Sequence, residues 1–494
     1  MKERMGKNKL FLFGFSLIGL LSVILRFYNY SLRFTLWVDQ ASFALLSRYA
    51  LFNHKLPLLG PFSSAGPFQT GGEWYWLMMF FQSVYPWSLI APWVGMTALG
   101  VAFVIAIMLL AEELAGKKFA LIVGLLTAVS AGQVSQGINL SNQSPLPLIS
   151  LFALWAGIRF LKEKKLSYLF TLSLLAGLAP AIHAQGFMLI PLVLIVLIFS
   201  GISFKKLALV VFGLFLPWLP IFIADSNNHF SNTYHLFSYY LRDQYKISLD
   251  VLGRRWLTYL GVFWPESWAN IIGGNIILGY LIPFFLMVLG AISVYSKSFS
   301  KASSFIILSF LAMLIMVRYA RVPLYDSNLL LIHPFIFLLT GWLILRCFKF
   351  NRIFGALLLL IIVILNLNTD MKIILNENNN SILAQNNRAF LIKRFPKTKF
   401  AIYDFKFKTP GVSQPLTLYL DEKNKIDDNG KKIGISIATF SAKLKLPVIY
   451  ARKGSYYIYD LDSLSQNQLL SVGFESVDPS AIYRNVQEWY KYKK

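Results

Sequence analysis

The chain alternates long apolar runs with short polar loops, a pattern typical of a protein that crosses a membrane many times. The first run, residues 10–25, follows a basic amino-terminal stretch and has no small-residue cleavage site after it, so we interpret it as an uncleaved first span. Further runs cover 88–111, 119–134, 145–161, 166–182, 187–203, 207–224, 275–295, 302–317, 328–345 and 353–368. Each approaches the roughly 20 residues that a bilayer requires, so we expect about eleven transmembrane helices.

Alternate short loops share a basic character, and they lie on the same side as the amino terminus. The loops at 135–144 and 183–186 contain neither Lys nor Arg. The positive-inside rule therefore predicts a multi-pass protein with a cytoplasmic amino terminus. The basic amino terminus and the absence of eukaryotic targeting features favour the plasma (inner) membrane of a bacterium. An odd number of spans then leaves the long first loop and the carboxyl-terminal segment outside. The basic positions are Lys117, Lys118, Lys162, Lys164, Lys165, Lys205, Lys206, Lys297, Lys301, Arg346, Lys349 and Arg352.

Composition supports the same class. Of the 494 residues, 56% are hydrophobic, and the mean hydropathy is +0.56. These values exclude an ordinary soluble enzyme. The net charge of +24 does not indicate nucleic-acid binding, because the basic residues punctuate the apolar runs instead of forming one patch. Cys347 is the single cysteine, so the chain has no internal disulfide and no cysteine metal motif.

Three polar pieces are predicted outside the membrane: the loops 27–87 and 225–274, and a soluble domain over 371–494. We therefore divide the chain into a membrane domain, 1–370, and this extracytoplasmic α/β or mixed domain. Short runs of β-forming residues between turn signals predict its strands, and residues 478–492 predict a closing helix. The candidate strands are 399–405, 415–420, 431–437, 447–451 and 456–461.

The first loop is too long for a simple connection and rich in aromatic residues, which indicates a function at the membrane surface. Asp39 stands near its start, where Asp39, Phe43, Leu46 and Ala50 recur at helical spacing. Two interpretations of Asp39 are open and are not exclusive. It is a catalytic carboxylate, or it is the N-cap of the helix, although Ser42 occupies the position where a capping box has Glu or Gln.

The segments WVDQAS and GPFQTGGEWYW, together with the arrangement of spans and loops over residues 10–370, carry a resemblance. The chain resembles the GT-C glycosyltransferases, and within them glycosyltransferase family 39, the protein mannosyltransferase and lipid A aminoarabinose transferase type. That family has an Asp–Glu pair in the first loop, whereas Gln40 follows Asp39 here. Glu73 is the candidate for the missing second carboxylate.

The resemblance implies transfer of a hexosyl or pentosyl group from a polyprenyl-phosphate donor to a hydroxyl on a glycan, lipid or protein acceptor at the outer face, with inversion. Asp39 would take the proton of the attacking hydroxyl. No nucleotide site is required, because the activated sugar arrives on a lipid. A divalent cation is possible as a cofactor, but we assign no metal ligands.

Arginines are the candidates for holding the departing lipid phosphate. Arg318 and Arg321 lie together at an outer loop that otherwise lacks cations, and the alternative is a pair of side chains that snorkel from a helix end. Arg254 and Arg255, in the second long loop, are the other candidates, with contact to lipid headgroups as their alternative role. His333 is either a substrate ligand or, more commonly for a lone histidine, a packing residue.

Further substrate contacts are expected at the end of the first loop. Trp74 has a ring that stacks on sugars, although an interfacial aromatic belt is the commoner role of such residues. Gln69 precedes two glycines that let the backbone approach a ligand, or that simply form a turn.

Two other functions fit the same pattern. A transporter or assembly scaffold for lipid-linked glycans would place charges along the middle of its spans, whereas the ionisable residues here cluster at span ends. A glycan polymerase or ligase would use the same outer arginines but consume a lipid-linked oligosaccharide.

Overall fold

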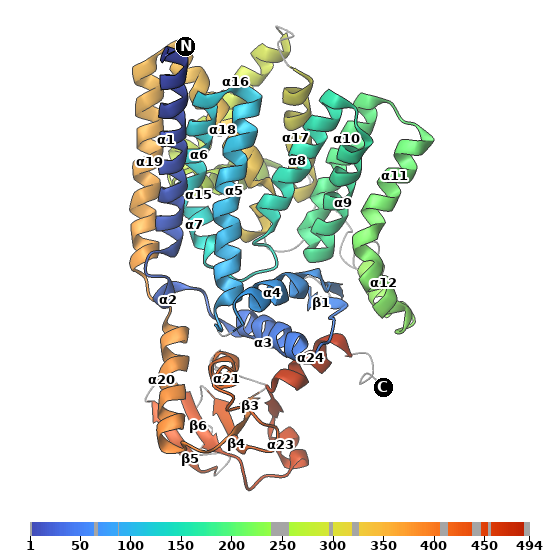
Figure 1. Ribbon diagram of the computed structural model, residues 1–494, viewed down its shortest axis with the longest axis vertical. Coiled ribbons are helices and arrows are strands. Elements are labelled where there is room, and N and C mark those ends of the chain that lie inside the picture. The colour runs from blue at the N-terminus through green and yellow to red at the C-terminus, as the bar shows by residue number, and fades with distance from the viewer. Residues whose placement is uncertain are drawn as a thin grey trace. The chain divides into compact units, whose positions relative to one another are not determined.

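The computed structural model describes residues 2–63, 68–86, 88–238, 256–295, 300–318, 326–405, 413–436, 446–452 and 456–488. The fold consists of two compact units, each assembled from separate stretches of the chain (Figure 1). The membrane unit comprises Met1–Tyr30, Phe62–Gly71 and Met96–Asn376; the mixed unit comprises Ser31–Pro61, Gly72–Gly95 and Glu377–Lys494. The functional division predicted at residue 370 stays a prediction.

Every predicted apolar run is mainly helical, although the run 207–224 is divided between two helices. Helices make up the membrane unit. They are α1 (Lys2–Phe27), α5 (Ala91–Ala115, which begins in the mixed unit), α6 (Lys117–Ala128), α7 (Ala131–Gly137), α8 (Leu146–Glu163), α9 (Leu166–Ile182), α10 (Ile190–Ser200), α11 (Phe204–Phe215), α12 (Leu219–Ser226), α13 (Ser231–Ser238), α15 (Trp264–Ile272), α16 (Ile276–Tyr295), α17 (Lys301–Arg318), α18 (His333–Phe350) and α19 (Arg352–Leu375). Short 3-10 turns join several of them.

Seven helices of the described chain are long and apolar enough to cross a membrane: Asn8–Phe27, Ala91–Ala115, Phe204–Ser226, Ile276–Ser293, Lys301–Arg318, Leu329–Phe350 and Arg352–Arg394. The pair α6 and α7, bent by 58°, would make an eighth. Leu166–Ile182 and Ala184–Ser200 are apolar but shorter. The structure confirms a helical polytopic membrane protein, and the expected number of about eleven spans depends on such short helices.

Small residues set the close packing of this unit. A Cβ at Gly177 of α9 would lie 2.3 Å from the carbonyl oxygen of Leu214 in α11, and one at Gly213 would lie 2.8 Å from Cβ of Ser173. The backbones of the two helices therefore approach each other closely. Close van der Waals packing of this kind drives helix association in a membrane, because the hydrophobic effect does not favour helix contacts over lipid contacts there.

The end of α6 is held by a buried arginine. Arg26 of α1 is fully buried and donates to the carbonyl oxygens of Ala128, at 3.0 Å, and Thr127, at 3.3 Å. These are the last carbonyls of α6, which have no partner within the helix. A cation at a helix carboxyl end also complements the helix dipole. Arg26 thus stabilises the break between α6 and α7.

The mixed unit contains a five-stranded sheet in the order β5-β6-β4-β3-β7. Its strands are β3 (Phe400–Phe405), β4 (Lys431–Ser436), β5 (Val448–Arg452), β6 (Tyr456–Asp460) and β7 (Phe474–Ser476). β3 and β4 run parallel, with Ile402 opposite Ile433, and the remaining pairs are antiparallel. The short strands β1 (Leu59–Phe62) and β2 (Gln69–Gly71) lie outside this sheet.

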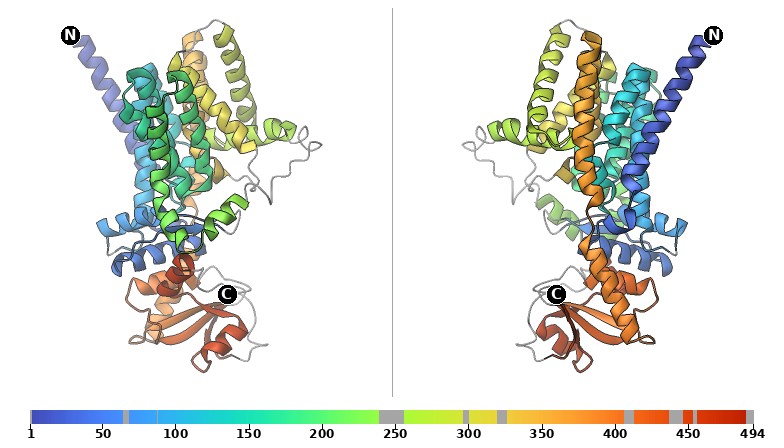
Figure 2. Two further views of the ribbon diagram at one scale, coloured as in Figure 1. Left: turned by 90° about the vertical axis from the view of Figure 1, so that its right-hand side faces the viewer. Right: turned by 90° about the vertical axis from the view of Figure 1, so that its left-hand side faces the viewer.

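The sheet is covered on both faces, as the orange and red elements show (Figure 1 and Figure 2). Phe400 and Ile402 pack against α20 (Asn379–Arg394) and α21 (Ser413–Asp421), whereas Ala401 and Tyr403 belong to a second core with α23 (Gln466–Val472). Successive side chains of a strand point to opposite faces, so β3 contributes to both layers. The closing helix α24 (Pro479–Gln487) forms as predicted.

One predicted strand is wrong. Residues 415–420 lie in α21, and the fifth strand is β7, which the sequence did not reveal. Leu416, Leu418 and Leu420 alternate as in a strand, but all three are buried because α21 packs both on the sheet and on α3 (Val38–Phe52). A short apolar run that is buried all round carries no usable period.

Candidate active site

The helix that carries Asp39 begins two residues earlier than the capping interpretation requires. Trp37 is the N-cap of α3, and its backbone N–H donates to the side-chain oxygen of Gln40 at 3.1 Å. Asp39 is therefore not the cap but a first-turn residue, where a negative charge complements the helix dipole. Its side chain is exposed, and within the described chain it makes no hydrogen bond or ion pair.

The second acidic residue opens α4 (Glu73–Val84). The preceding Gly72 is required by a close approach of two backbones: a Cβ there would lie 2.0 Å from the carbonyl oxygen of Pro57. The Gly72 N–H donates to the Leu58 carbonyl at 3.1 Å. This contact joins the start of α4 to the segment after α3, and it explains one of the glycines of the motif GPFQTGGEWYW.

Glu73 is buried, and neither of its carboxyl oxygens has a hydrogen-bond partner in the part of the chain that the structure describes. Burial raises the pKa of Glu73 to about 7, although its own backbone amide acts in the opposite direction. A buried carboxyl without a partner stays protonated more readily than an exposed one. The pKa of Glu73 therefore lies within the physiological pH range, where its carboxyl group is partly protonated.

Aromatic rings hold α3 and α4 together. The ring of Phe43 contacts those of Trp74 and Tyr75 edge-on, at centroid distances of 6.0 and 6.2 Å. Burial raises the pKa of Tyr75, and the nearby negative charge of Asp39 raises it further. The packing therefore brings the exposed carboxylate of Asp39 close to a buried aromatic pair on α4.

Trp74 is wholly buried and Tyr75 nearly so, which places both rings inside the protein instead of in an interfacial belt. Trp76 is half-buried, and its ring N–H donates to the Pro57 carbonyl at 2.7 Å. Stacking of a sugar on Trp74 stays a prediction; in this structure its indole supports α3.

The remaining predicted residues that the structure describes lie in the membrane unit. Gln69 exchanges two backbone hydrogen bonds with the side chain of Asn232, at 2.6 and 3.2 Å, and Asp225 in turn accepts from the backbone of Asn232. This reciprocal amide pair fixes β2 against α13. The sequence offered no signal for Asn232, because a lone asparagine in a long loop is commonplace.

Arg318 ends α17 with only 7% of its surface exposed, and its guanidinium lies 5.2 Å from the ring centroid of Trp256. The buried guanidinium is thus placed for a cation–π contact with Trp256. Phosphate binding and snorkelling both stay predictions for Arg318. Arg321, Arg254 and Arg255 lie outside the described residues, and their roles stay predictions.

His333 begins α18 and is 1% exposed. Its Nδ1 lies 2.5 Å from the amide nitrogen of Gln133 in α7, so the amide donates and the imidazole proton resides on Nε2. Nε2 has no hydrogen-bond partner within the described chain. A role of His333 in packing thus explains the hydrogen bond at Nδ1 but leaves the Nε2–H without a partner among the described residues. Nothing in the sequence indicated that Gln133 is its partner.

The chain is similar to known proteins in part of its sequence and in its fold. Residues 74–223 match the model of the family described as dolichyl-phosphate-mannose-protein mannosyltransferase. The structure resembles ArnT from Cupriavidus metallidurans in the apo state, with a TM-score of 0.58 and 10% identity over 92% of this chain and 98% of that one. It also resembles the same protein bound to undecaprenyl phosphate, with a TM-score of 0.60 and 12% identity over 93% and 98% of the chains. A comparison with curated proteins finds no match.

The chain has a GT-C-like fold. The resemblance predicted from the motifs is thereby confirmed, and the matched family segment begins at Trp74, one residue after Glu73. For a divalent cation, the described ranges offer no group of three or more His, Cys, Asp or Glu residues that could hold one. We therefore derive no step through a metal ion.

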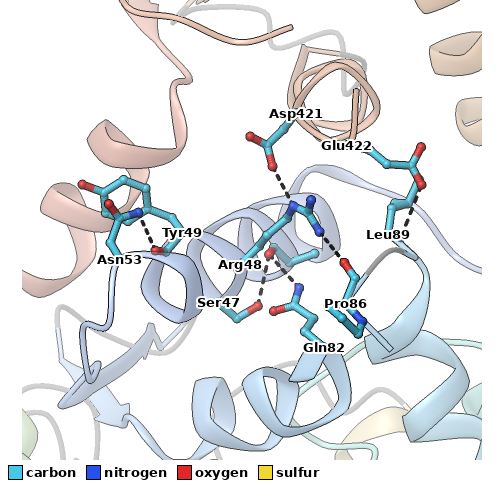
Figure 3. A network of polar contacts seen from close by, with 10 residues as sticks. Ser47, Arg48, Tyr49, Asn53, Gln82, Pro86, Leu89, Asp421 and Glu422 are labelled. Carbon is cyan, nitrogen blue, oxygen red and sulfur yellow. Dashed lines mark hydrogen bonds and ion pairs between the residues drawn. The ribbon is translucent and has the colours of Figure 1, made fainter. Parts of the chain in front are cut away.

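The GT-C-like fold also contains a polar network that sequence reasoning missed (Figure 3). Arg48 of α3 forms an ion pair with Asp421 of α21 at 2.9 Å, and it donates to the Pro86 carbonyl at 3.2 Å. Gln82 of α4 donates to the Ala44 carbonyl at 3.2 Å. More than 370 residues separate Arg48 from Asp421, so nothing in the local sequence pattern indicated their contact.

Proposed function

We propose that this chain is a membrane glycosyltransferase that moves a sugar from a polyprenyl-phosphate-linked donor to an acceptor hydroxyl. Two findings support the proposal: the match of residues 74–223 to a mannosyltransferase family, and a fold shared with ArnT, which has been crystallised with undecaprenyl phosphate. The proposal covers a hexosyl or a pentosyl group as the sugar. It covers a glycan, a lipid or a protein as the acceptor.

In the proposed mechanism Asp39 is the general base. Its carboxylate takes the proton of the acceptor hydroxyl while the hydroxyl oxygen attacks the anomeric carbon, and the bond to the lipid phosphate breaks on the opposite side, which inverts the anomeric configuration. The observation that carries this assignment is the position of Asp39: it is exposed, it makes no hydrogen bond to described residues, and its negative charge acts on the buried Tyr75 of α4.

The departing phosphate needs positive charge, and we propose Arg318 for this role, with Arg321, Arg254 and Arg255 as further candidates. A guanidinium that is already buried and stacked on Trp256 loses little freedom when it binds a phosphate oxygen. We propose that the Nε2–H of His333 and the groups around Gln69 contact the substrate, and that Glu73 supplies the second carboxyl of the family pair.

We further propose that the reaction takes place on the extracytoplasmic face of the plasma membrane. The support is the sequence pattern of basic loops, which predicts that the amino terminus is cytoplasmic and that both the first loop and the carboxyl-terminal domain are outside.

The test is turnover by the purified chain in liposomes that contain polyprenyl-phosphate-linked hexoses or pentoses. We expect free polyprenyl phosphate to be released, and we expect Asp39→Asn to lower its release by about a hundredfold or more while the protein stays monodisperse. Asn53→Ala, at the exposed end of the same helix, serves as the control. Full activity of Asp39→Asn would remove the mechanism. Movement of intact donor without cleavage would instead favour the transporter, and consumption of lipid-linked oligosaccharide alone would favour the polymerase or ligase.

A further inference from the structure

The carboxyl-terminal segment of this chain holds the helix that carries Asp39. We propose that α21 and α24 position α3 for catalysis and that Arg48 is the positioning residue through which α21 acts. This inference rests on the proposed function of Asp39. It gives the carboxyl-terminal segment a role in the transfer reaction itself, beyond being a separate soluble domain.

The first step concerns how α3 and α21 lie. The hydroxyl of Ser42 donates to the side-chain oxygen of Gln414 at 2.5 Å, and Arg48 binds Asp421 at 2.9 Å. The two contacts are six residues apart on α3 and seven apart on α21, and their order along the chain is the same. At a rise of about 1.5 Å per residue, these spacings are similar, so α21 contacts α3 at two separate places along its length.

The second step concerns the guanidinium of Arg48, which joins three pieces of chain. Its Nε binds Asp421, and its Nη1 donates to the carbonyl of Pro86 just after α4 (Figure 3). The guanidinium also lies 4.8 Å from the ring centroid of Phe52. The side chains of Arg48 and Asp421 are only 15% and 28% exposed. Burial raises the pKa of Asp421, and the positive charge of Arg48 opposes that shift. The ion pair therefore offsets part of the cost of burying the carboxylate.

The third step concerns α24, which packs on the carboxyl-terminal part of α3, next to Arg48. Tyr483 packs on Tyr49 with ring centroids 5.5 Å apart, and the ammonium of Lys55 lies 5.1 and 5.0 Å from the two rings. Just beyond α3, Gln487 accepts hydrogen bonds from the backbone of Leu58 and Leu59 at 2.9 and 3.0 Å. The helix is thus fastened along its length by two segments from the end of the chain.

The last step joins this scaffold to Asp39. Within the described residues the Asp39 carboxylate makes no hydrogen bond or ion pair that would hold it in place. Its position is therefore set by the backbone of α3 alone. General-base catalysis depends on placement within about 1 Å, so whatever holds α3 controls the reaction.

The first measurement does not depend on activity. A nitroxide is attached to Asp39→Cys in a Cys347→Ser chain, and its mobility is read from the line shape of the full-length protein in nanodiscs. We expect Arg48→Ala and Asp421→Ala to raise the mobility of the label. Arg48→Lys should restore most of the order, because it keeps the charge opposite Asp421 but not the fork of donors. Lys399→Ala, which removes an exposed ion pair with Asp427 in the same unit, should change nothing. Identical line shapes in all variants would overturn the inference.

The second measurement uses the same substitutions with Asp39 intact. We expect kcat to fall about tenfold in Arg48→Ala and Asp421→Ala, with a smaller change in KM for the polyprenyl-phosphate donor, since the base and not the donor is displaced. The double variant should lose no more than either single one, and Arg48→Asp with Asp421→Arg should recover part of kcat. Independent, additive losses would overturn the role of Arg48. A mobile label with undiminished turnover would instead show that α3 is held as proposed but that Asp39 is not the base.

Discussion

The side chain of Gln487, in the last helix, pairs with the backbone of Leu59, in the first loop, in the manner of a neighbouring strand. Its oxygen accepts from the Leu59 N–H at 3.0 Å, and its nitrogen donates to the Leu59 carbonyl at 2.5 Å. The two residues are 428 positions apart in sequence. One amide thus satisfies both polar groups of a buried backbone position and fastens the first loop to the end of the chain.

This pairing predicts that Gln487→Ala will loosen the segment after α3. Leu58 and Leu59 would lose their acceptor, and an unsatisfied buried backbone group costs about 1–3 kcal/mol. We expect the amides of both leucines to exchange with deuterium at least tenfold faster in the variant, measured by mass spectrometry of the detergent-solubilised protein. The control Gln466→Ala, at the exposed start of α23, should leave this segment unchanged. Equal protection in both variants would contradict the role of Gln487.

The buried carboxyl of Glu73 predicts a dependence of stability on pH. Its pKa rises from 4.5 in the unfolded chain to about 7 in the folded protein, so the unfolded state loses the proton first as pH increases. The contribution of Glu73 to stability is therefore fully present below pH 4.5 and is lost as pH rises through about 7. The loss corresponds to about 3 kcal/mol, at 1.36 kcal/mol for each unit of pKa shift.

The measurement compares the wild-type chain with Glu73→Gln, which cannot ionise. We expect the two melting temperatures to lie close together near pH 4.5 and the variant to become the more stable one by pH 8, at a fixed scan rate. Other titrating groups are common to both proteins, so their effects cancel in the difference. Parallel curves across this range would mean that Glu73 is not held in a low-dielectric site.

The carbonyls at the end of α6 predict a severe effect of removing Arg26. In Arg26→Met a side chain of similar length remains, but Thr127 and Ala128 lose their donor in a buried place. Each unsatisfied group costs about 1–3 kcal/mol, so thermal unfolding in detergent should begin many degrees lower. Arg352→Met, at the exposed start of α19, is the matched control. Equal melting of the two variants would show that Arg26 does not stabilise the α6–α7 break.

The close approach at Gly72 predicts that even a methyl group is not tolerated there. A Cβ 2.0 Å from the Pro57 carbonyl would force α4 away from the segment that follows α3. We expect Gly72→Ala to lower the melting temperature and to reduce transfer activity. Gly19→Ala, in α1, where no atom lies within 4 Å of the added methyl, should be neutral or slightly stabilising. A fully active and stable Gly72→Ala would show that the backbone rearranges at little cost.

The hydrophobic pattern of the sequence predicts much of this fold. The apolar runs mark the membrane helices because a spanning helix must be apolar over a length fixed by the bilayer, whatever its neighbours are. Residues 166–182 were predicted as one run and form one helix with the same bounds. β3, β4, β5 and β6 were likewise readable, since turn residues separate short runs of β-formers. The roles of Asp39 and the arginines stay predictions.

Other features were decided only when distant parts of the chain met. The residues of α21 alternate as in a strand, yet they form a helix that packs on both the sheet and α3. Glu73 looks like any loop acid, yet the fold buries it, and burial raises its pKa. Local sequence gives no sign of three contacts that the fold creates. They join Arg48 to Asp421, Gln487 to Leu59, and Gln133 to His333. Local sequence sets the period and length of each element, whereas burial and pairing are properties of the surroundings that tertiary structure alone supplies.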